Sequence, residues 1–598
     1  MPLTKNGHIE SPPLSEHQWV DAYVALYHKL LESPGKIVLD ELETAHRRID
    51  SSLHRSSGSK GVNLSAFVYA AERLPPCLPL VKRIIIAPTE KVFVECGYGH
   101  VLDWERDGAH RRRRRAHFDG RDILAIFANS ISDFDDLVPS LCAYQIEWNA
   151  MHRRLHASAL GQAVAAGRMR ASETAEEIRR LFGANTGDWG LFLRLWPDEW
   201  DMHLKAIADA PKKMIVERLP LRRGDFERSA AEWIDAVMNH FPDIDGETRP
   251  AYIVSSNTHS MANLISGYAF EHADEIIADA LDEVIDDDDD YLRGYWRRLK
   301  YEDESLRRDF LYYALRAFLK RHPDRIPEKI AQEESVGLRR FTPDHLLHLE
   351  AQIIELHKID PRRLDPCLGI WPTASAAGGI PSRRGRHRQG EALRHDGRQK
   401  DGAVVFNIDY PLGFSAYYVM KMILTRMKRV RGVFILGKSA AMIGRLGDIM
   451  IPEEVRDAHS GNLYRFRNVF SAGTIVPYLA ETAVFDEQRT LTVRGTFLHS
   501  RYTVRDFRGA DFTGIEMEAG PYLSALDEHL SGATARKSAV IAIAPAFPVG
   551  ILHYTSDTPY NLRASLLSRR MGLTGLEATY ACSRAILDAI RQGSGLHS

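Results

Sequence analysis

The pattern of hydrophobic and polar positions changes near residue 401. Beyond it, short apolar runs alternate with longer segments whose apolar residues recur at helical spacing. Strands are expected at 403–409, 431–437, 447–452, 491–498, 512–517, 539–545 and 549–555, and helices at 414–430, 473–486, 519–531 and 562–592. Such an alternation is typical of an α/β domain whose mixed sheet is covered by helices on both faces.

The first 240 residues are mainly helical by the same criterion. Helices are expected at 15–55, 67–74, 137–160 and 171–240, and strands at 81–87, 91–96 and 122–129. The residues before them are polar and contain proline. We therefore predict a disordered lead at 1–14 and a mainly helical α+β domain at 15–240.

A buried strand is expected at 251–256, ending in a polar turn before a helix. We assign this strand to the α/β domain, which then comprises 241–262 and 401–598. The residues between, 263–400, form a predicted helical insertion, because much of this segment is charged and has helical spacing.

Two parts of the insertion have a strongly biased composition. Five consecutive aspartates at 286–290 indicate a solvated segment, since the spacing and the glycine of a calcium loop are missing. Residues 374–400 are rich in Gly, Ser and Arg, which predicts a flexible basic loop. A basic lid that closes over a phosphorylated ligand is the functional alternative for this loop.

Composition is ordinary for a soluble protein, with 44% hydrophobic residues, 26% charged residues and a net charge of −2. The balanced charge gives no reason to expect nucleic acid or a membrane as a partner. Neither a signal peptide nor a run of about 18 apolar residues is found, so we expect a cytoplasmic protein. The five cysteines form no CxxC pair, which argues against a disulfide framework and a structural zinc.

Two charged runs also suggest ligands. Five arginines at 111–115 could bind phosphate or RNA, but without interleaved aromatic residues a solvated loop or pairing with acids is favoured. Asp133, Asp135 and Asp136 precede an apolar helix, where acids cap the helix and complement its dipole. A divalent metal there would need further ligands. We therefore predict no metal and no cofactor.

The candidate chemistry centres on Glu516-Met517-Glu518, between a polar loop and an apolar run. In an extended segment the two carboxylates point to one face and the methionine to the other. Together they could hold a sugar, with its hydroxyls on the acids and its carbon face on the thioether. Taken alone, the motif is better interpreted as a solvated acidic strand end.

Four other segments change this interpretation. They are 404–416 with Gly413 and Ser415, 432–441 with Gly437, Lys438 and Ser439, the Gly447-Asp448 segment at 447–452, and 553–557 with Ser556 and Asp557. In this order around the Glu-Met-Glu motif, they resemble the nucleoside phosphorylase/nucleosidase superfamily, most closely its AMP nucleosidase branch. The resemblance covers about residues 250–260 and 402–595, and it implies a three-layer α/β/α fold.

The resemblance also implies roles for single residues. Glu518 would grip the ribose hydroxyls, Met517 would pack against the sugar, and Glu516 would lie beside the reacting region. Asp557 would protonate the purine ring, oriented by Ser556, and a buried aspartate needs a raised pKa for that role. The other matches are Gly413 and Ser415 near the 5′ substituent or phosphate, Gly437, Lys438 and Ser439 in a turn below the sugar, and Asn257 and His259 in the same pocket. Without the resemblance, Ser556 and Asp557 would be a helix N-cap and His259 a hydrogen-bonded loop residue.

The chain departs from the family pattern in ways that bear on the nucleophile. Ile435 stands where the phosphorylases carry an arginine, and Ala440-Ala441 replaces the usual glycine pair. Lys438 or Arg445 could substitute for the arginine, but a lysine is a point charge rather than a fork. Water is therefore favoured over phosphate. The glutamate that activates water in adenosylhomocysteine-type nucleosidases has no counterpart at 255–260, which leaves Glu516 as the candidate base.

These observations predict a nucleosidase that hydrolyses the N-glycosidic bond of a purine nucleotide or nucleoside. A phosphorolytic nucleoside phosphorylase is the alternative enzyme. A nucleotide-binding sensor or scaffold that has lost turnover is the alternative outside enzymes. The resemblance further implies a homo-oligomer, either a dimer or a hexamer built from dimers.

Overall fold

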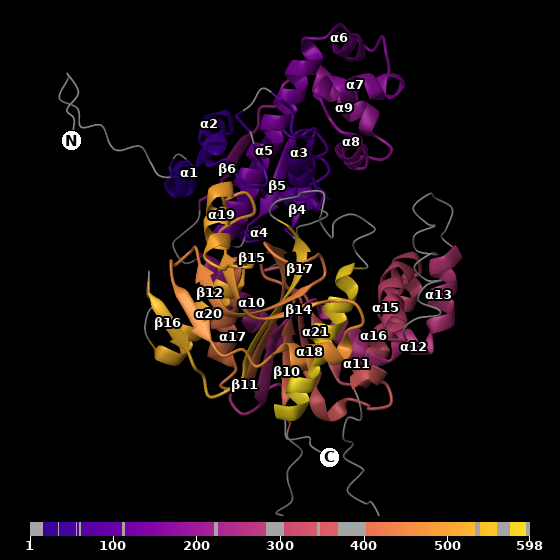
Figure 1. Cartoon of the computed structure of the whole chain (residues 1–598), viewed down its shortest axis with the longest axis vertical. Helices are drawn as coiled ribbons and strands as arrows, with labels where there is room; N and C mark the ends of the chain where they lie inside the picture. Colours follow the sequence, from indigo (N-terminus) through magenta and orange to yellow (C-terminus); the bar gives the residue numbers. More distant parts are fainter. Residues whose placement is uncertain are drawn as a thin grey trace, which may run out of the picture.

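The computed structural model describes residues 16–33, 35–55, 57–58, 61–109, 114–128, 130–220, 225–282, 304–343, 347–368, 402–532, 539–558 and 574–593. They form two units, each with its own sheet (Figure 1). We call residues 16–220 the N-terminal unit and residues 225–593 the C-terminal unit. The predicted lead at 1–14, the aspartates at 286–290 and the basic loop at 374–400 lie outside the described residues.

The N-terminal unit is built on a six-stranded sheet in the order β1-β6-β2-β5-β4-β3. Its strands are β1 (Lys36–Val38), β2 (Arg83–Ala87), β3 (Glu105–Arg106), β4 (Ala116–Phe118), β5 (Ile123–Phe127) and β6 (Ile215–Arg218). Its helices are α1 (Glu16–Glu32), α2 (Asp40–Ile49), α3 (Leu64–Ala71), α4 (Glu90–Glu95), α5 (Ile131–His156), α6 (Ala159–Ala165), α7 (Ala175–Phe182), α8 (Thr186–Leu193) and α9 (Trp200–Asp209). Because β2 is parallel to β5 and β6, the carboxyl ends of these three strands share one edge of the sheet.

The long helix α5 begins just after β5, at that edge. Ser130 and Asp133 form a capping box there, in which Asp133 Oδ2 accepts the Ser130 N–H over 3.0 Å. From this start the helix runs through the core of the unit, and most of its residues are buried. Of the acids expected at the start of this helix, Asp133 lies in the first turn, whereas Asp135 and Asp136 lie in the second, because the helix begins at Ile131 rather than at 137.

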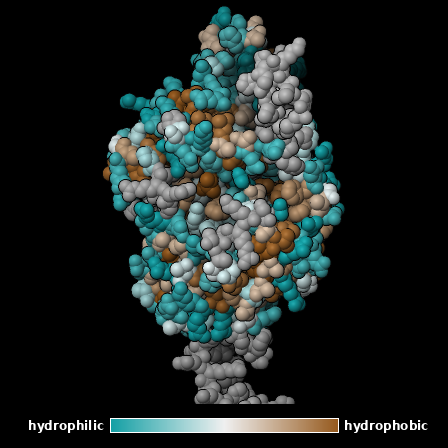
Figure 2. All heavy atoms as spheres, turned by 90° about the vertical axis from the view of Figure 1, so that its left-hand side faces the viewer, coloured by the Kyte–Doolittle hydropathy of each residue, from teal (hydrophilic) through white to brown (hydrophobic). Residues whose placement is uncertain are grey.

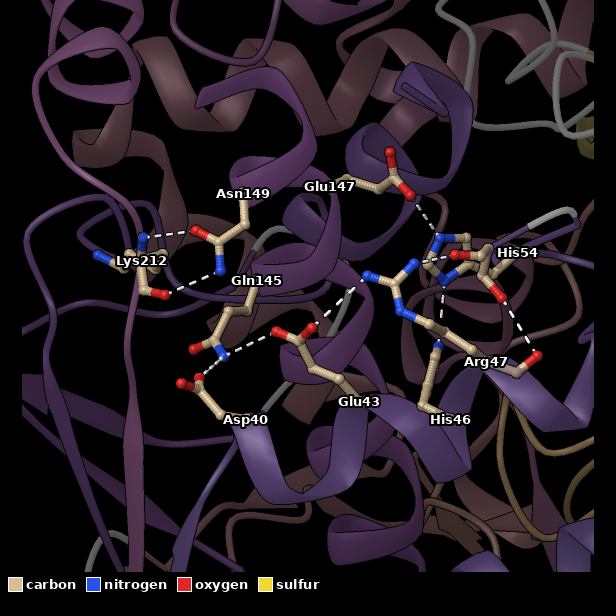
Figure 3. A network of polar contacts seen from close by, with 10 residues as sticks. Asp40, Glu43, His46, Arg47, His54, Gln145, Glu147, Asn149 and Lys212 are labelled. Atoms are coloured by element: carbon tan, nitrogen blue, oxygen red, sulfur yellow. Dashed lines mark hydrogen bonds and ion pairs between the residues drawn. The ribbon is translucent and has the colours of Figure 1, made fainter. Parts of the chain in front are cut away.

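A buried polar network binds the α2 region to α5 (Figure 3). His54 Nε2 lies 2.8 Å from Glu147 Oε1, and His46 Nε2 lies 3.1 Å from His54 Nδ1. Beside them, Gln145 donates to Asp40 over 2.7 Å. Polar groups inside a core are costly unless they are hydrogen-bonded, and here the partners come from both helices.

The C-terminal unit is built on an eleven-stranded mixed sheet. Its strands are β7 (Pro250–Ser255), β8 (Leu338–Phe341), β9 (Ala351–Glu355), β10 (Val404–Ile408), β11 (Arg429–Ala441), β12 (Ile449–Asp457), β13 (Leu463–Phe466), β14 (Val484–Thr492), β15 (Gly514–Glu516), β16 (Val540–Ile543) and β17 (Val549–Asp557). The order is β16-β13-β12-β14-β15-β11-β7-β10-β9-β8, and β17 pairs with both β11 and β12.

These pairings close a ring within the sheet. The strand β17 connects β11 to β12, and β14 and β15 lead back from β12 to β11. Because the ring is closed, the ends of β11, β15 and β17 are brought to one place. The motifs predicted to carry the chemistry stand at or just after these ends.

Helices cover the sheet on two faces, each with its own core. One core is shared by α10 (Asp225–His240), α17 (Ser415–Arg426) and α20 (Ala519–Ser531). The other is shared by α11 (Thr258–Ser266), α12 (Tyr268–Glu271), α13 (Ala273–Asp282), α15 (Glu304–Arg321) and α21 (Thr574–Gly593), with α16 (Ile326–Ser335) and α18 (Ala472–Ile475) nearby. Helix α10, which the sequence placed at the end of the N-terminal domain, packs on α17 of the C-terminal unit.

Many of the expected strands and helices are confirmed, including β7, β10, β12, β17 and α20. Residues 91–96 were expected as a strand, but 91–95 lie in α4 and Cys96 is its C-cap, and the helix buries Phe93 against Phe127. Residues 473–486 were expected as one helix, but before β14 begins they contain only the short α18 and a 3₁₀ helix at Val476–Tyr478. The strand expected at 491–498 corresponds to β14, which begins earlier and ends at Thr492, so residues 493–498 lie outside the sheet.

Other elements escaped the sequence pattern. The helix expected at 15–55 is interrupted by β1, which follows Gly35 in a positive-φ conformation and pairs with β6. The strand β6 itself lies in a segment expected to be helical. Strands β8 and β9 lie within the predicted helical insertion and extend the sheet beyond β10. That prediction was incomplete, since part of the insertion belongs to the sheet.

The two units are joined by residues 493–500, which we call the inserted segment. Phe497 is fully buried in the core of the N-terminal unit, although it follows β14 of the C-terminal sheet. The His499 carbonyl accepts the Ser52 N–H over 3.1 Å. Just beyond, in α19 (Arg501–Gly509), the Arg501 guanidinium lies 2.6 Å from the Asp50 carboxylate.

Figure 2 shows the left-hand side of Figure 1, where hydrophilic and hydrophobic residues are mixed and no single kind covers the face. Among the described residues, no helix is long and apolar enough to cross a membrane.

Candidate functional site

The Glu516-Met517-Glu518 motif forms the corner between β15 and α20. Glu516 Oε2 accepts the N–H groups of Glu518 and Ala519, each over 2.6 Å, and its Oε1 accepts the Thr492 hydroxyl. Burial, followed by the charge of Glu518, raises the pKa of Glu516 to about 7. The buried carboxyl therefore fixes the backbone from which Met517 and the half-buried Glu518 project.

Glu518 contacts the loop after β10. Its Oε1 accepts the Gly413 N–H over 3.1 Å, and the next amide, Phe414 N–H, donates to Ser132 Oγ over 2.7 Å. Gly413 has a φ of +53°, and a Cβ atom there would lie 2.4 Å from Ser132 Oγ and 3.7 Å from Met517 Cε. The loop is thus held by one side chain from each unit, and it tolerates only glycine at 413.

The strand β11 places the other half of the predicted site. Its residue Ala440 pairs with Ile515 of β15 on one side and with Asp557 of β17 on the other. Neighbouring strands lie about 4.8 Å apart, so Ile515 and Asp557 lie roughly 10 Å apart across β11. Ser556 Oγ donates to Asp557 Oδ2 over 3.2 Å. Asp557 ends a strand, and the helix that it was alternatively expected to cap lies outside the described residues.

Residues Gly437, Lys438 and Ser439 do not form the expected turn. They lie inside β11, which continues to Ala441 and pairs with β17 along this stretch. A Cβ atom on Gly437 would lie 2.9 Å from His553 Cδ2, so the glycine makes room for a buried imidazole. Lys438 is exposed, and its ammonium lies 5.9 Å from the centre of the Tyr554 ring.

The remaining predicted residues lie at the carboxyl ends of neighbouring strands. Asn257 is buried and caps α11, because its Oδ1 accepts the Ser260 N–H over 2.8 Å. His259 is exposed in the first turn of α11, and Ser415 is buried at the start of α17. Since β7, β10 and β11 are parallel, all three residues share the edge that carries Gly413.

His459 was not predicted and lies beside this loop. Its ring centre is 5.1 Å from that of Phe414, and its backbone N–H donates to Asp457 Oδ1 over 3.0 Å. Burial lowers the pKa of His459, and its shielded Nε2 has no hydrogen-bond partner among the described residues. The Arg494 guanidinium donates to the carbonyl just before it, that of Ala458, over 3.1 Å. The Asp-x-His-Ser turn after β12 was the sequence feature that could have drawn attention to His459. The sequence alone did not indicate that this turn lies near residue 414.

The arginines and acids of the N-terminal unit pair with each other. Arg114 forms ion pairs with Asp133, over 3.0 Å, and with Asp136. Arg115 pairs with Glu90 over 2.5 Å. For these two arginines, the interpretation as partners for acids is confirmed, and residues 110–113 lie outside the described part of the chain. Within the described ranges, no group of three or more His, Cys, Asp or Glu side chains could hold a metal ion.

Solved structures similar to this chain include 5′-methylthioadenosine/S-adenosylhomocysteine nucleosidases. The protein from Neisseria meningitidis is 10% identical, with 57% of this chain and 99% of that one covered and a TM-score of 0.29. For the Streptococcus pneumoniae protein the identity is 9%, the coverages are 57% and 98%, and the TM-score is 0.27. The Colwellia psychrerythraea protein is 17% identical, with 32% of this chain and 80% of that one covered and a TM-score of 0.24. With TM-scores this low, the description of the fold rests on the strand pairing of this chain itself.

No curated protein matches the chain. A family model does match, over residues 39–592, and it is described as a family of unknown function, DUF6909. The match runs from α2 to the end of α21 and so includes both units and the inserted segment. This chain is therefore a member of the DUF6909 family.

Proposed function

We propose that the chain cleaves the N-glycosidic bond of a purine nucleotide or nucleoside by hydrolysis. The observation that carries this proposal is the convergence of three separate motifs. Glu518 binds the Gly413 loop directly, and β11 lies between the strands that end in Glu516 and Asp557. Segments far apart in sequence thus lie near one edge of the sheet, which supports the assignment of these groups to one site.

The chemistry follows from the charges that develop as the bond breaks. Positive charge builds on the sugar and negative charge on the departing base, so an acid near the base and a carboxylate near the sugar both stabilise the transition state. Glu518 is assigned to the ribose hydroxyls and Met517 to the carbon face of the sugar. Asp557, oriented by Ser556, is assigned to the base, roughly two strand spacings away.

The contacts of Glu516 suit a group that fixes Glu518. Its carboxyl oxygens accept two backbone N–H groups and one hydroxyl, so it is already engaged before any ligand binds. Those bonds hold the first turn of α20, which carries Glu518 at its N-cap. We therefore assign Glu516 to positioning, in preference to the activation of water.

Water remains the proposed nucleophile. Ile435, at the position where an arginine would bind phosphate, is buried within β11 and offers no charge. One of the two candidate replacements, Lys438, is exposed on the same strand. A cytoplasmic homo-oligomer remains the expectation for the protein in the cell.

The test is release of free base from a panel of AMP, adenosine, methylthioadenosine, inosine, guanosine and NMN, with and without phosphate. Wild type is compared with Asp557→Asn and with Asp274→Asn, a matched change at an exposed residue of α13. We expect release without phosphate, reduced by about 100-fold or more in Asp557→Asn, as is typical for the loss of a general acid. Asp274→Asn should behave as wild type.

Other outcomes would select the alternatives. Release that requires phosphate would make the protein a phosphorylase and would point to Lys438 as an anion contact. Binding of these compounds without release would indicate a nucleotide sensor. Equal activity in Asp557→Asn and wild type would remove Asp557 from the role of acid.

A further inference from the structure

The N-terminal unit reaches the candidate site through the start of α5. Ser132, in the first turn of that helix, is fully buried, and its Oγ accepts the Phe414 N–H over 2.7 Å. The preceding amide, Gly413 N–H, donates to Glu518 Oε1 over 3.1 Å. Two consecutive amides of one loop are therefore bound by side chains that are far apart in the chain and belong to different units.

The fit between Ser132 and the loop is close. A Cβ atom on Gly413 would lie 2.4 Å from Ser132 Oγ and 2.6 Å from Ser132 Cβ, so the loop approaches the helix as nearly as glycine allows. Gly413 also has positive φ, which only glycine adopts readily. The loop conformation that presents an N–H to Glu518 is thus the one that Ser132 stabilises.

Further contacts keep α5 in place over the loop. The Asp135 carbonyl lies against Gly495 of the inserted segment, where a Cβ atom would approach it to 2.3 Å. Asp136 Oδ1 accepts the Thr496 hydroxyl over 2.6 Å. The first two turns of α5 are therefore fixed to the C-terminal unit at three points, with Ser132 as the one that contacts the candidate site.

We propose that Ser132 is a positioning residue of the site, which orients Glu518 through the Gly413 loop, so that the N-terminal unit is an integral part of the site. The consequences of this inference for substrate binding rest on the proposed function. The contacts among Ser132, the Gly413 loop and Glu518 do not depend on it. Loss of the Ser132 hydroxyl frees the Phe414 amide and loosens the loop whose Gly413 N–H donates to Glu518.

The test compares Ser132→Ala with Ser140→Ala in the full-length protein. Ser140 is an equally buried serine of α5 whose hydroxyl donates to the Asp136 carbonyl and does not contact the loop. Hydrogen exchange of the peptide that contains residues 411–418 is measured first. We expect exchange at this peptide to be at least about five-fold faster in Ser132→Ala, which corresponds to one hydrogen bond, and unchanged in Ser140→Ala.

The second readout is the kinetics of base release on the best substrate of the panel. Ser132→Ala should raise KM about five-fold with a smaller change in kcat, and it should add little when combined with Glu518→Gln, since both act through one loop. If wild type releases no base, the proposed function fails while hydrogen exchange still decides the positioning role. Equal exchange in Ser132→Ala and Ser140→Ala overturns the inference, whatever the activity.

Discussion

At the scale of single residues, Glu516 combines burial with three hydrogen bonds, and its pKa of about 7 lies above the 4.5 of a free glutamate. The folded chain therefore binds this proton more tightly than the unfolded chain between these two values. Its contribution to stability is present below pH 4.5 and is lost as the pH rises to about 7.

Glu516→Gln removes this titration and keeps an oxygen that can accept the same backbone N–H groups. From pH 5 to pH 8, we expect wild type to lose on the order of 2–3 kcal/mol of unfolding free energy relative to the variant. Urea unfolding of both proteins across this range measures the difference. Other buried acids such as Asp309 are present in both proteins and cancel. Parallel stability curves would show that Glu516 does not titrate in this window.

At the scale of elements, β11 shows why part of the site was misread from sequence. Gly437 looked like the glycine of a ligand-binding turn, whereas it lies mid-strand opposite His553. Gly437→Ala should destabilise the fold by about 1–3 kcal/mol, because its methyl group would press on a buried imidazole. Gly190→Ala in α8, where a Cβ atom meets nothing within 4 Å, is the control and should be neutral or stabilising.

Thermal unfolding checks this prediction, and His553→Ala provides a second test. In the double variant the methyl group gains room, so the two changes should be less than additive. If Gly437→Ala weakened ligand binding with no effect on stability, the turn interpretation would be restored and the strand role refuted.

Hydrophobic periodicity correctly predicted the elements that are buried in a regular pattern. The runs that became β7 and β10 are mostly apolar and buried throughout, as is typical of parallel strands covered on both faces, and the apolar face of α20 was equally clear. It failed for α4, where β-forming residues build one helical turn around Phe93. It also failed for β14, whose first six residues are not fully buried and include the polar run 486–489. In such segments tertiary pairing decides the structure, and one sequence contains no record of the partner.

In the candidate site, too, some residues could be predicted from the sequence and others could not. Motif order predicted that Glu516, Glu518 and Asp557 would gather, and β11 lies between the strands that end in Glu516 and Asp557. Their gathering around one ligand stays a prediction. Ser132 was missed because its relevance comes from packing between the two units. His459 was missed because it packs on Phe414, which lies far from it in the chain.

At the scale of the whole molecule, the inserted segment makes the two units mutually dependent. Phe497 is fully buried among Tyr69, His46 and His54 of the N-terminal unit, with ring centres 5.6 to 6.4 Å away. Removing a buried aromatic ring costs about 3–5 kcal/mol. Phe497 belongs by sequence to the C-terminal unit, but its ring lies in the core of the N-terminal unit. Its loss therefore weakens the attachment between the two units as well as the core of the N-terminal unit.

We therefore expect wild type to unfold in one cooperative transition and Phe497→Ala to unfold in two, with the N-terminal unit first. Hydrogen exchange at increasing urea follows each unit separately, through peptides of α5 and of α17. Phe507→Ala is the control, because the partly buried Phe507 packs against Phe512 within the C-terminal unit. That variant should lower stability while both units still unfold together. Two transitions in wild type, or one in Phe497→Ala, would show that the units are coupled by contacts other than this segment.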